Sequence, residues 1–253
     1  MSNNHNVFDG KASYYAKYRP GYPNKILDLL KEEAGFSRYW VVADIGSGTG
    51  ILSDLFLKNG NSVYCIEPNA DMRTALLQHN LQSSNCFILD GTAEDTGLEE
   101  NSVDLIVAGQ SFHWFDPVMT KKEFARILKP GGYVALIWNN RSETEESLSK
   151  NYDHICEQFS KNYHGTGNTR ISYDTFNSFF DRGYGKFQIP NNQELDLEAL
   201  IGRYLSTSYS LDPEDTGYES ALSGLKALFE RFEKQGKVTM EYETQIFLGV
   251  LKG

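Results

Sequence analysis

The stretch VVADIGSGTG, from Val41 to Gly50, is an apolar run that ends in an acid and passes into a glycine-rich turn. Within the turn, three glycines alternate with Ser47 and Thr49. Glycine lets the main chain lie where a Cβ atom would clash, and it tolerates a positive φ angle. The stretch therefore predicts a strand followed by a turn whose backbone lies against a ligand.

The spacing of the glycines bears on which ligand this is. A phosphate loop needs G-x-x-x-x-G-K-[ST], and no lysine follows Gly50. The dinucleotide fingerprint is G-x-G-x-x-G, whereas the glycines here stand at 46, 48 and 50, and Ile51 takes the sixth position. Asp44 precedes the turn, where it would face a pyrophosphate unfavourably. The spacing alone is a weak signal, because many strand-to-helix turns carry glycines.

Glu67 supplies a second signal. It ends the next apolar run, 21 residues after Gly46. An acid at this place can accept hydrogen bonds from both ribose hydroxyls of an adenosine ligand, and the alternative role is a helix N-cap. Taken together, Asp44, the glycines and Glu67 favour a ligand that has an adenosine end and a cationic end but no phosphates.

Up to Asn140, apolar runs alternate with segments that have one apolar face. Strands are predicted near 40–46, 62–67, 86–90, 103–109 and 132–138. Helices are predicted between them, with Asn69 and the Asp116-Pro117 pair as N-terminal caps, and the KPGG stretch at 129–132 is predicted to be a turn. Strands buried on both faces and alternating with helices are typical of a doubly wound α/β sheet.

After Asn140 the alternation stops. Residues 141–163 are polar and predict a helix, and further helices are predicted near 195–206 and 217–235. Residues 237–250 alternate and predict a closing strand. Residues 164–194 mix glycine, asparagine and aromatic residues, and no element is assigned to them.

The composition restricts the partners. The chain has 253 residues, 40% of them hydrophobic, with 24 basic against 34 acidic residues and a net charge of −10. Tight binding to a nucleic-acid backbone needs clustered positive charge, and no Lys/Arg-rich run is present. The N-terminus is polar, and no apolar stretch approaches the roughly 20 residues of a membrane span. We therefore expect a soluble cytoplasmic protein with neither a nucleic acid nor a membrane as partner.

The cysteines and histidines predict no special chemistry. The chain has an odd number of cysteines, namely Cys65, Cys86 and Cys156. We expect them to be buried free thiols in a reducing compartment. The histidines are scattered without the spacing of metal ligands, so no metal is predicted.

Six stretches together resemble the class I S-adenosylmethionine-dependent methyltransferases, in particular the type 11 family and its trans-aconitate methyltransferase-like branch. They include FDGKASYYAKYRPGYP (8–23), DIGSGTG (44–50), IEPNADM (66–72), DGTAEDTGL (90–98), SVDLIVAGQSFHWFD (102–116) and EFARILKPGGYVALIW (123–138). The resemblance implies a Rossmann-like seven-stranded sheet with a helical cap inserted after the fifth strand. Residues 1–140 would form the cofactor-binding core with an N-terminal lid segment. Residues 141–253 would form the cap and the closing helix and strands of the same domain.

The resemblance also implies the cofactor, S-adenosylmethionine, and the residues that bind it. Asp44 would attract the amino group of the cofactor, Glu67 would bind the ribose, and Arg19 would pair with the carboxylate. Thr92 stands where the family often has an aspartate beside the adenine. The full implied set is Tyr15, Arg19, Asp44, Gly46, Ser47, Gly48, Glu67, Pro68, Met72, Thr92, Ala93, Glu94, Gln110 and Ser111.

The acceptor side has fewer signals. The Asn/Asp-Pro-Pro-Tyr/Phe motif of amine-methylating enzymes is absent from the FHWFD stretch, 112–116. His113 is a candidate general base or, alternatively, an aromatic wall of the pocket, as Trp114 would be. Arg203, with Arg141 or Arg170, is a candidate to bind a carboxylate.

These observations predict methyl transfer to a small-molecule acceptor, with a carboxylic acid as one candidate. A non-catalytic S-adenosylmethionine-binding regulatory protein and a nicotinamide-dependent Rossmann oxidoreductase are the alternatives.

Overall fold

The computed structural model describes residues 11–80, 84–142, 144, 146–161, 163 and 171–251. Within these residues the strands are β1 (Val41–Ile45), β2 (Ser62–Ile66), β3 (Cys86–Leu89), β4 (Val103–Gly109), β5 (Leu128–Arg141), β6 (Tyr184–Leu195) and β7 (Val238–Gly249). The helices are α1 (Ala12–Tyr18), α2 (Lys25–Ala34), α3 (Ile51–Asn59), α4 (Ala70–Asn80), α5 (Pro117–Ile127), α6 (Leu148–Gln158), α7 (Tyr173–Phe179), α8 (Leu197–Leu205) and α9 (Tyr218–Phe232). A short 3₁₀ helix, η2, spans Phe112–Trp114.

The strands form one seven-stranded sheet in the order β3-β2-β1-β4-β5-β7-β6. The first five strands are parallel, and β7 runs antiparallel to both β5 and β6. The order reverses between β1 and β4, and ligands of doubly wound sheets bind beyond the carboxyl ends of the strands at such a point. The predicted seven-stranded Rossmann-like sheet is therefore confirmed, and the turn after β1 lies at its ligand-binding edge.

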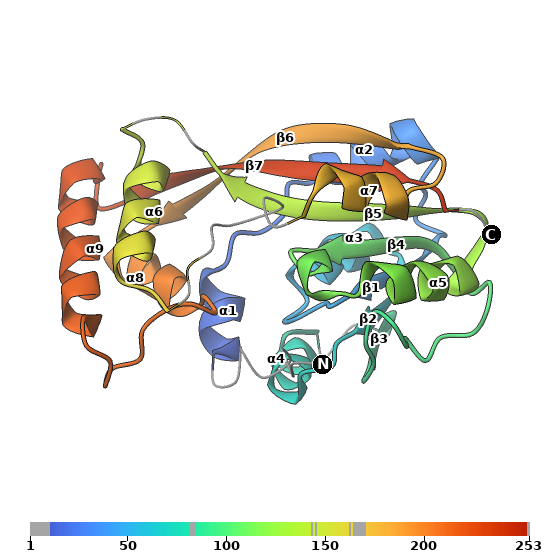
Figure 1. Ribbon diagram of the computed structural model, residues 1–253, viewed down its shortest axis with the longest axis horizontal. Helices are drawn as coiled ribbons and strands as arrows, with labels where there is room; N and C mark the ends of the chain where they lie inside the picture. The colour runs from blue at the N-terminus through green and yellow to red at the C-terminus, as the bar shows by residue number, and fades with distance from the viewer. Residues whose placement is uncertain are drawn as a thin grey trace.

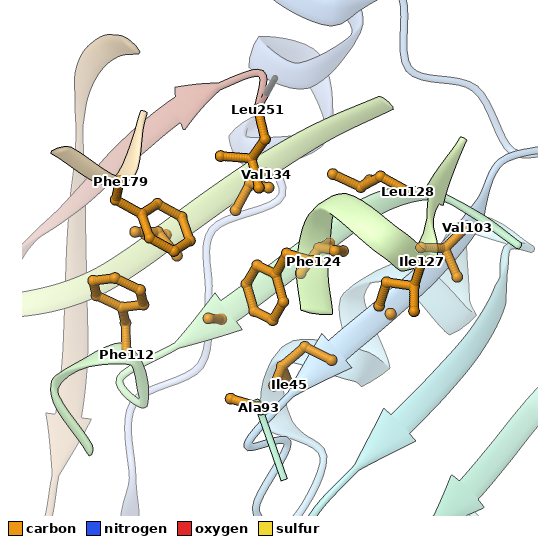
Figure 2. Close-up of a cluster of buried hydrophobic side chains, with 14 of the residues drawn as sticks. Ile45, Ala93, Val103, Phe112, Phe124, Ile127, Leu128, Val134, Phe179 and Leu251 are labelled. Atoms are coloured by element: carbon orange, nitrogen blue, oxygen red, sulfur yellow. The ribbon is translucent and has the colours of Figure 1, made fainter. Parts of the chain in front are cut away.

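Helices cover both faces of the sheet (Figure 1). On one face, α5 and α7 pack over β4 and β5, and Figure 2 shows Phe112, Phe124 and Phe179 directed at one another there. On the other face, buried residues of α2, α3 and α4 pack on β1, β2 and β4. Both predicted caps form, since Asp116 accepts from the backbone of Val118 and Asn69 accepts from Met72.

A third cluster of buried residues lies at one end of β6 and β7, where α6, α8 and α9 pack together. Figure 1 shows these helices gathered at the far end of the long strands β5, β6 and β7, with α1 beside them. α6 follows β5, whereas α8 and α9 lie between β6 and β7. Helices from two separate connections therefore form this helical unit, which we define as α6, α8 and α9.

Two parts of the sheet differ from the sequence analysis. Strand β6 and helix α7 occupy residues that had no assigned element. β6 is the edge strand, with polar residues along it and Pro190 inside it, and polar residues and proline both weaken a strand pattern. The KPGG stretch is not a turn before β5 but part of it, where the register with β4 shifts. In the part of the chain described, no helix is long and apolar enough to cross a membrane.

Candidate active site

One pocket opens at the carboxyl ends of β1 and β4. It is lined by Tyr15, Arg19, Pro20, Tyr22, Asp44, Gly46, Ser47, Gly48, Ile51, Leu52, Gly109, Gln110, Asn139 and Arg203. The structure thus brings together residues from α1, from the glycine turn, from the ends of β4 and β5, and from α8. Eight of these residues were singled out from the sequence, namely Tyr15, Arg19, Asp44, Gly46, Ser47, Gly48, Gln110 and Arg203.

The glycine turn is held against the second strand. The backbone amides of Gly46 and Ser47 donate to the carbonyl of Ile66 at 2.9 and 3.1 Å. Gly46 has a φ of 65°, and a Cβ added there would lie 2.7 Å from the Cβ of Ser111. The hydroxyl of Ser47 is buried and has no hydrogen-bond partner in the protein. The turn therefore requires glycine and leaves a polar group for a ligand.

Glu67 connects the end of β2 to the same turn. One carboxylate oxygen accepts from the backbone N–H of Gly48 at 2.8 Å, and the other accepts from that of Asn69 at 2.9 Å. The side-chain oxygen of Asn69 itself accepts from the backbone of Met72 and caps α4. Glu67 is therefore fixed in place beside the turn, and its contact with a ribose stays a prediction.

Asp44 is the buried acid of the pocket. It is 1% exposed, and its Oδ2 accepts from the hydroxyl of Ser53 at 2.6 Å. Its Oδ1 has no hydrogen-bond partner in the protein. Burial raises the pKa of the Asp44 carboxyl to about 7. A cationic group in the pocket would pair with Oδ1 and favour the ionised form.

Two arginines line the pocket together with Asp44, the partly buried Arg19 and the buried Arg203. Arg19 donates through Nη2 to the carbonyl of Ser206 at 3.0 Å, and its guanidinium lies 4.6 Å from the ring centroid of Tyr15. Arg203 is 4% exposed and donates through Nε to the hydroxyl of Tyr242 at 3.2 Å. Arg19 Nε and Arg203 Nη1 are buried without a hydrogen-bond partner. Burial and then the charge of Arg203 lower the pKa of Arg19.

The end of β4 is shaped by Gln110 and Ser111. Gln110 has a φ of 59° and donates through its side-chain amide to the carbonyl of Asn139 at 3.1 Å. Ser111 is buried and donates to the carbonyl of Ile45 at 2.7 Å. These bonds tie the ends of β1, β4 and β5 together below the pocket.

Several predicted residues do not line this pocket. Thr92 accepts from the backbone of Asp95, Ala93 is in the core, and Glu94 accepts from the backbone of Asp116. Pro68 is partly buried and Met72 is buried, and both residues follow β2 in the sequence. These residues follow β2, which is next to β1, and β3, which pairs with β2, where the adenine end of the ligand was predicted.

The aromatic stretch after β4 is divided between two environments. Phe112 lies in the core, with its ring centroid 4.7 Å from that of Phe179 (Figure 2). His113 and Trp114 are partly buried, and their ring centroids lie 4.9 Å apart. Neither is among the lining residues of the pocket.

The other two candidate arginines also differ from Arg203. Arg141 forms an ion pair with Asp153, so a carboxylate already neutralises it. Arg170 lies outside the described residues.

Sequence reasoning missed Tyr22 and Asn139. A Cβ added at Gly109 would meet the hydroxyl of Tyr22 at 2.7 Å, so this ring lies over the end of β4. Asn139 comes at the end of the apolar run of β5, and its side-chain oxygen accepts from Thr244 at 2.6 Å. A polar residue directly after a buried parallel strand was the available signal for Asn139.

Comparison with known proteins identifies the domain. Residues 43–136 match the family model described as a methyltransferase domain. Rv3342 of Mycobacterium tuberculosis, named an uncharacterized methyltransferase, is 36% identical over 54% of this chain and 53% of its own length. The match thus spans about half the length of this relative. C25B8.10 of Schizosaccharomyces pombe, named an uncharacterized methyltransferase-like protein, is 25% identical over 95% of this chain and 94% of its own.

Solved structures show the same fold. A candidate type II methyltransferase from Anaeromyxobacter dehalogenans has a TM-score of 0.63 and 18% identity, covering 93% of this chain and all of its own. A candidate S-adenosylmethionine-dependent methyltransferase from Methanococcus maripaludis has a TM-score of 0.50 and 21% identity, covering 72% of this chain and 85% of its own. The family match on β1 to β5 favours the methyltransferase prediction over the oxidoreductase. Residues 43–136 of this chain therefore match a methyltransferase domain, and the chain has the fold of these solved methyltransferase structures.

Proposed function

We propose that the protein transfers the methyl group of S-adenosylmethionine to a small anionic acceptor, a carboxylic acid bound by Arg203. The methyltransferase domain supports the donor. The acceptor rests on one observation, which is the buried guanidinium of Arg203 in the same pocket as the glycine turn, without a carboxylate partner in the described part of the chain.

The residues of the pocket fit the proposed cofactor. Asp44 Oδ1 is a buried acceptor that lacks a donor, which suits an ammonium group. A side chain at Gly46 would clash with Ser111, whereas Gly48 has a φ of 56° that favours glycine. Arg19 offers a buried donor to a carboxylate. When bound, the cofactor supplies a methyl group that its sulfonium has already activated.

The charges of the pocket favour an anionic acceptor. Two buried guanidinium groups, Arg19 and Arg203, face one carboxyl group, Asp44. S-Adenosylmethionine brings one carboxylate, one ammonium and one sulfonium, which is a net positive charge. Without a second anion, positive charge would therefore remain unneutralised in a buried site, and unpaired buried charge is unfavourable. A carboxylate on the acceptor would neutralise Arg203.

Such a reaction asks little of the protein beyond alignment. A carboxylate is ionised near neutral pH and attacks the methyl group without a base. The residues of the pocket then orient donor and acceptor and exclude water. His113 need not remove a proton, which agrees with its position outside the pocket lining.

The test is a screen of carboxylic acids, hydroxyl compounds and amines with methyl-labelled cofactor. We expect label in an acid that yields a methyl ester. With that acid, Arg203→Ala should raise KM by about tenfold or more, as expected for a lost charge-assisted hydrogen bond, whereas Arg182→Ala at an exposed position should not. Cofactor binding without turnover on any acceptor would favour the regulatory alternative.

A second variant tests the absence of a base. His113→Ala should leave kcat nearly unchanged if the acceptor is a carboxylate. A loss of roughly 10²–10⁴-fold, as expected for a general base, would contradict the acid and indicate an acceptor that must lose a proton.

A further inference from the structure

Two cysteines that are far apart in the sequence meet beneath the glycine turn. The Sγ atoms of Cys65 in β2 and Cys86 in β3 lie 3.7 Å apart. In the parallel register Cys65 is opposite Ile88 and Cys86 is opposite Val63. The two thiols therefore lie diagonally on one face of the sheet. Cys65 is fully buried, whereas Cys86 is partly exposed.

A short chain of contacts joins this pair to the pocket. Cys65 Sγ lies 3.2 Å from the hydroxyl of Ser53, and that hydroxyl donates to Asp44 at 2.6 Å. Cys65 also precedes Glu67 by two residues, at the end of the same strand. A change at the thiol pair would thus reach the two acids that border the glycine turn.

The two thiols differ in reactivity. The side-chain contact with Cys65 lowers the pKa of Cys86, and the same contact, followed by burial, raises the pKa of Cys65. A thiolate reacts with oxidants faster than a thiol does, and exposure favours the reaction. Cys86 is therefore the first site of attack, and Cys65 is the sulfur within reach of the product.

We propose that Cys65 and Cys86 form a modification site at which hydrogen peroxide converts two thiols into a disulfide and thereby weakens cofactor binding. The Cys86 thiolate attacks a peroxide oxygen, the O–O bond breaks, and a sulfenic acid and water result after protonation. The Cys65 sulfur then attacks the Cys86 sulfur, its proton leaves with the departing hydroxide, and a second water forms. Two thiols are oxidised, and one peroxide is reduced to two waters.

The disulfide would disturb the pocket in two ways. The sulfurs must approach from 3.7 Å to about 2.05 Å, so Cys65 moves away from Ser53 and loses the proton it could donate to it. The bond is also diagonal to the strands, because Cys65 and Cys86 are two residues out of register, so closing it shifts β2 along β3. That shift moves Glu67 relative to the amide of Gly48.

The experiment compares wild-type protein with Cys86→Ser, Cys65→Ala and the control Cys156→Ser, before and after peroxide. Cys156 is buried in α6, away from the other two. Intact mass and peptide mapping detect the cross-link as the loss of two hydrogen atoms. Calorimetry measures binding of S-adenosylmethionine. We expect wild type and Cys156→Ser to form the cross-link and to bind about tenfold more weakly, as for one lost hydrogen bond to a charged group, with recovery on adding a thiol reductant.

Three outcomes of this experiment would overturn the proposal. Wild type that forms no Cys65–Cys86 cross-link, or a cross-linked protein that binds with unchanged affinity, would overturn the proposal. Equal peroxide sensitivity in Cys86→Ser would overturn it as well. The effect on binding rests on the proposed cofactor site. Failure of the reduced protein to bind would overturn that site, whereas the cross-link is read independently by mass.

Discussion

The buried carboxyl group of Asp44 lowers the stability of the folded protein when it is ionised. Its pKa is about 7 in the folded protein against an ordinary value of 3.8. The folded form therefore keeps a proton that the unfolded chain releases, and stability is lost as the pH rises from about 4 through about 7. Above this range the protein holds a buried carboxylate with one unpaired oxygen.

Asp44→Asn should remove this cost. We expect its free energy of unfolding to exceed that of wild type by on the order of 2 kcal/mol at pH 8 and to differ little at pH 4. Denaturant titrations at both pH values measure this. A variant that is less stable than wild type at pH 8 would contradict the assigned ionisation.

The same carboxyl predicts how cofactor binding depends on pH. The ionised form attracts a cation, so the affinity of wild type for S-adenosylmethionine should fall as the pH drops below about 7. Asp44→Asn should bind weakly at every pH, and its affinity should lack this dependence. Calorimetry at pH values on both sides of the Asp44 pKa of about 7 gives both profiles.

Glu67 permits a milder test of the ribose contact. Glu67→Gln keeps the size of the side chain but removes its charge and one of its two acceptors. We expect about tenfold weaker binding of both S-adenosylmethionine and its demethylated product, because hydrogen bonds to a charged group are lost. Glu99→Gln, at an exposed position, is the control. Equal affinities in the two variants would remove Glu67 from the site.

The N-terminal helix is bound to the helical unit rather than free-standing. The hydroxyl of Tyr18 donates to Glu198 of α8 at 2.6 Å, and Lys11 donates to the carbonyl of Thr207 at 3.0 Å. Gly202 of α8 lies so close to Tyr18 that an added Cβ would stand 2.3 Å from its ring. Arg19, at the end of α1, depends on this packing for its position in the pocket.

Gly202→Ala tests that dependence. We expect a loss of about 1–3 kcal/mol in unfolding free energy through overpacking, together with weaker cofactor binding because α1 shifts. Gly224→Ala in α9 is a matched control, since its Cβ would meet its nearest neighbour at an ordinary 3.6 Å. Normal cofactor affinity in Gly202→Ala would show that α1 packs on α8 without shaping the site.

The elements that could be predicted are those whose signal is local. The apolar runs that form β1 to β4, and the caps at Asn69 and Asp116, each depend on a few consecutive residues. β6 could not be predicted because an edge strand has polar residues and gains its pairing from β7, which lies far along the chain. The site divides in the same way. The turn and Glu67 are local, but the meeting of Arg19 with Arg203, and of Cys65 with Cys86, depends on the tertiary fold.

Taken as one molecule, the protein places its pocket between the sheet and the helical unit. Arg19 and Arg203 come from α1 and α8, whereas Asp44 and Gln110 come from the sheet. A ligand that contacts both the sheet and the helices α1 and α8 should therefore hold these two parts together.

Hydrogen exchange can detect this coupling. With S-adenosylmethionine bound, we expect slower amide exchange in α1 and α8 as well as in the glycine turn, because closing the pocket suppresses local opening. Helix α7, which packs on the opposite face of the sheet from α3, should exchange at the same rate with and without ligand. Protection limited to the glycine turn would indicate that the helical unit does not respond to the cofactor.

The long strands β5, β6 and β7 run without a break from the sheet into the helical unit (Figure 1). The family match, by contrast, ends at residue 136, before β5 leaves the parallel part of the sheet. The part that carries the glycine turn and the part that bears Arg203 are thus joined by a ribbon whose pairing depends on backbone rather than on side chains. In evolution or in engineering, one set of helices could be exchanged for another along this ribbon, and an inherited donor site would gain a new acceptor.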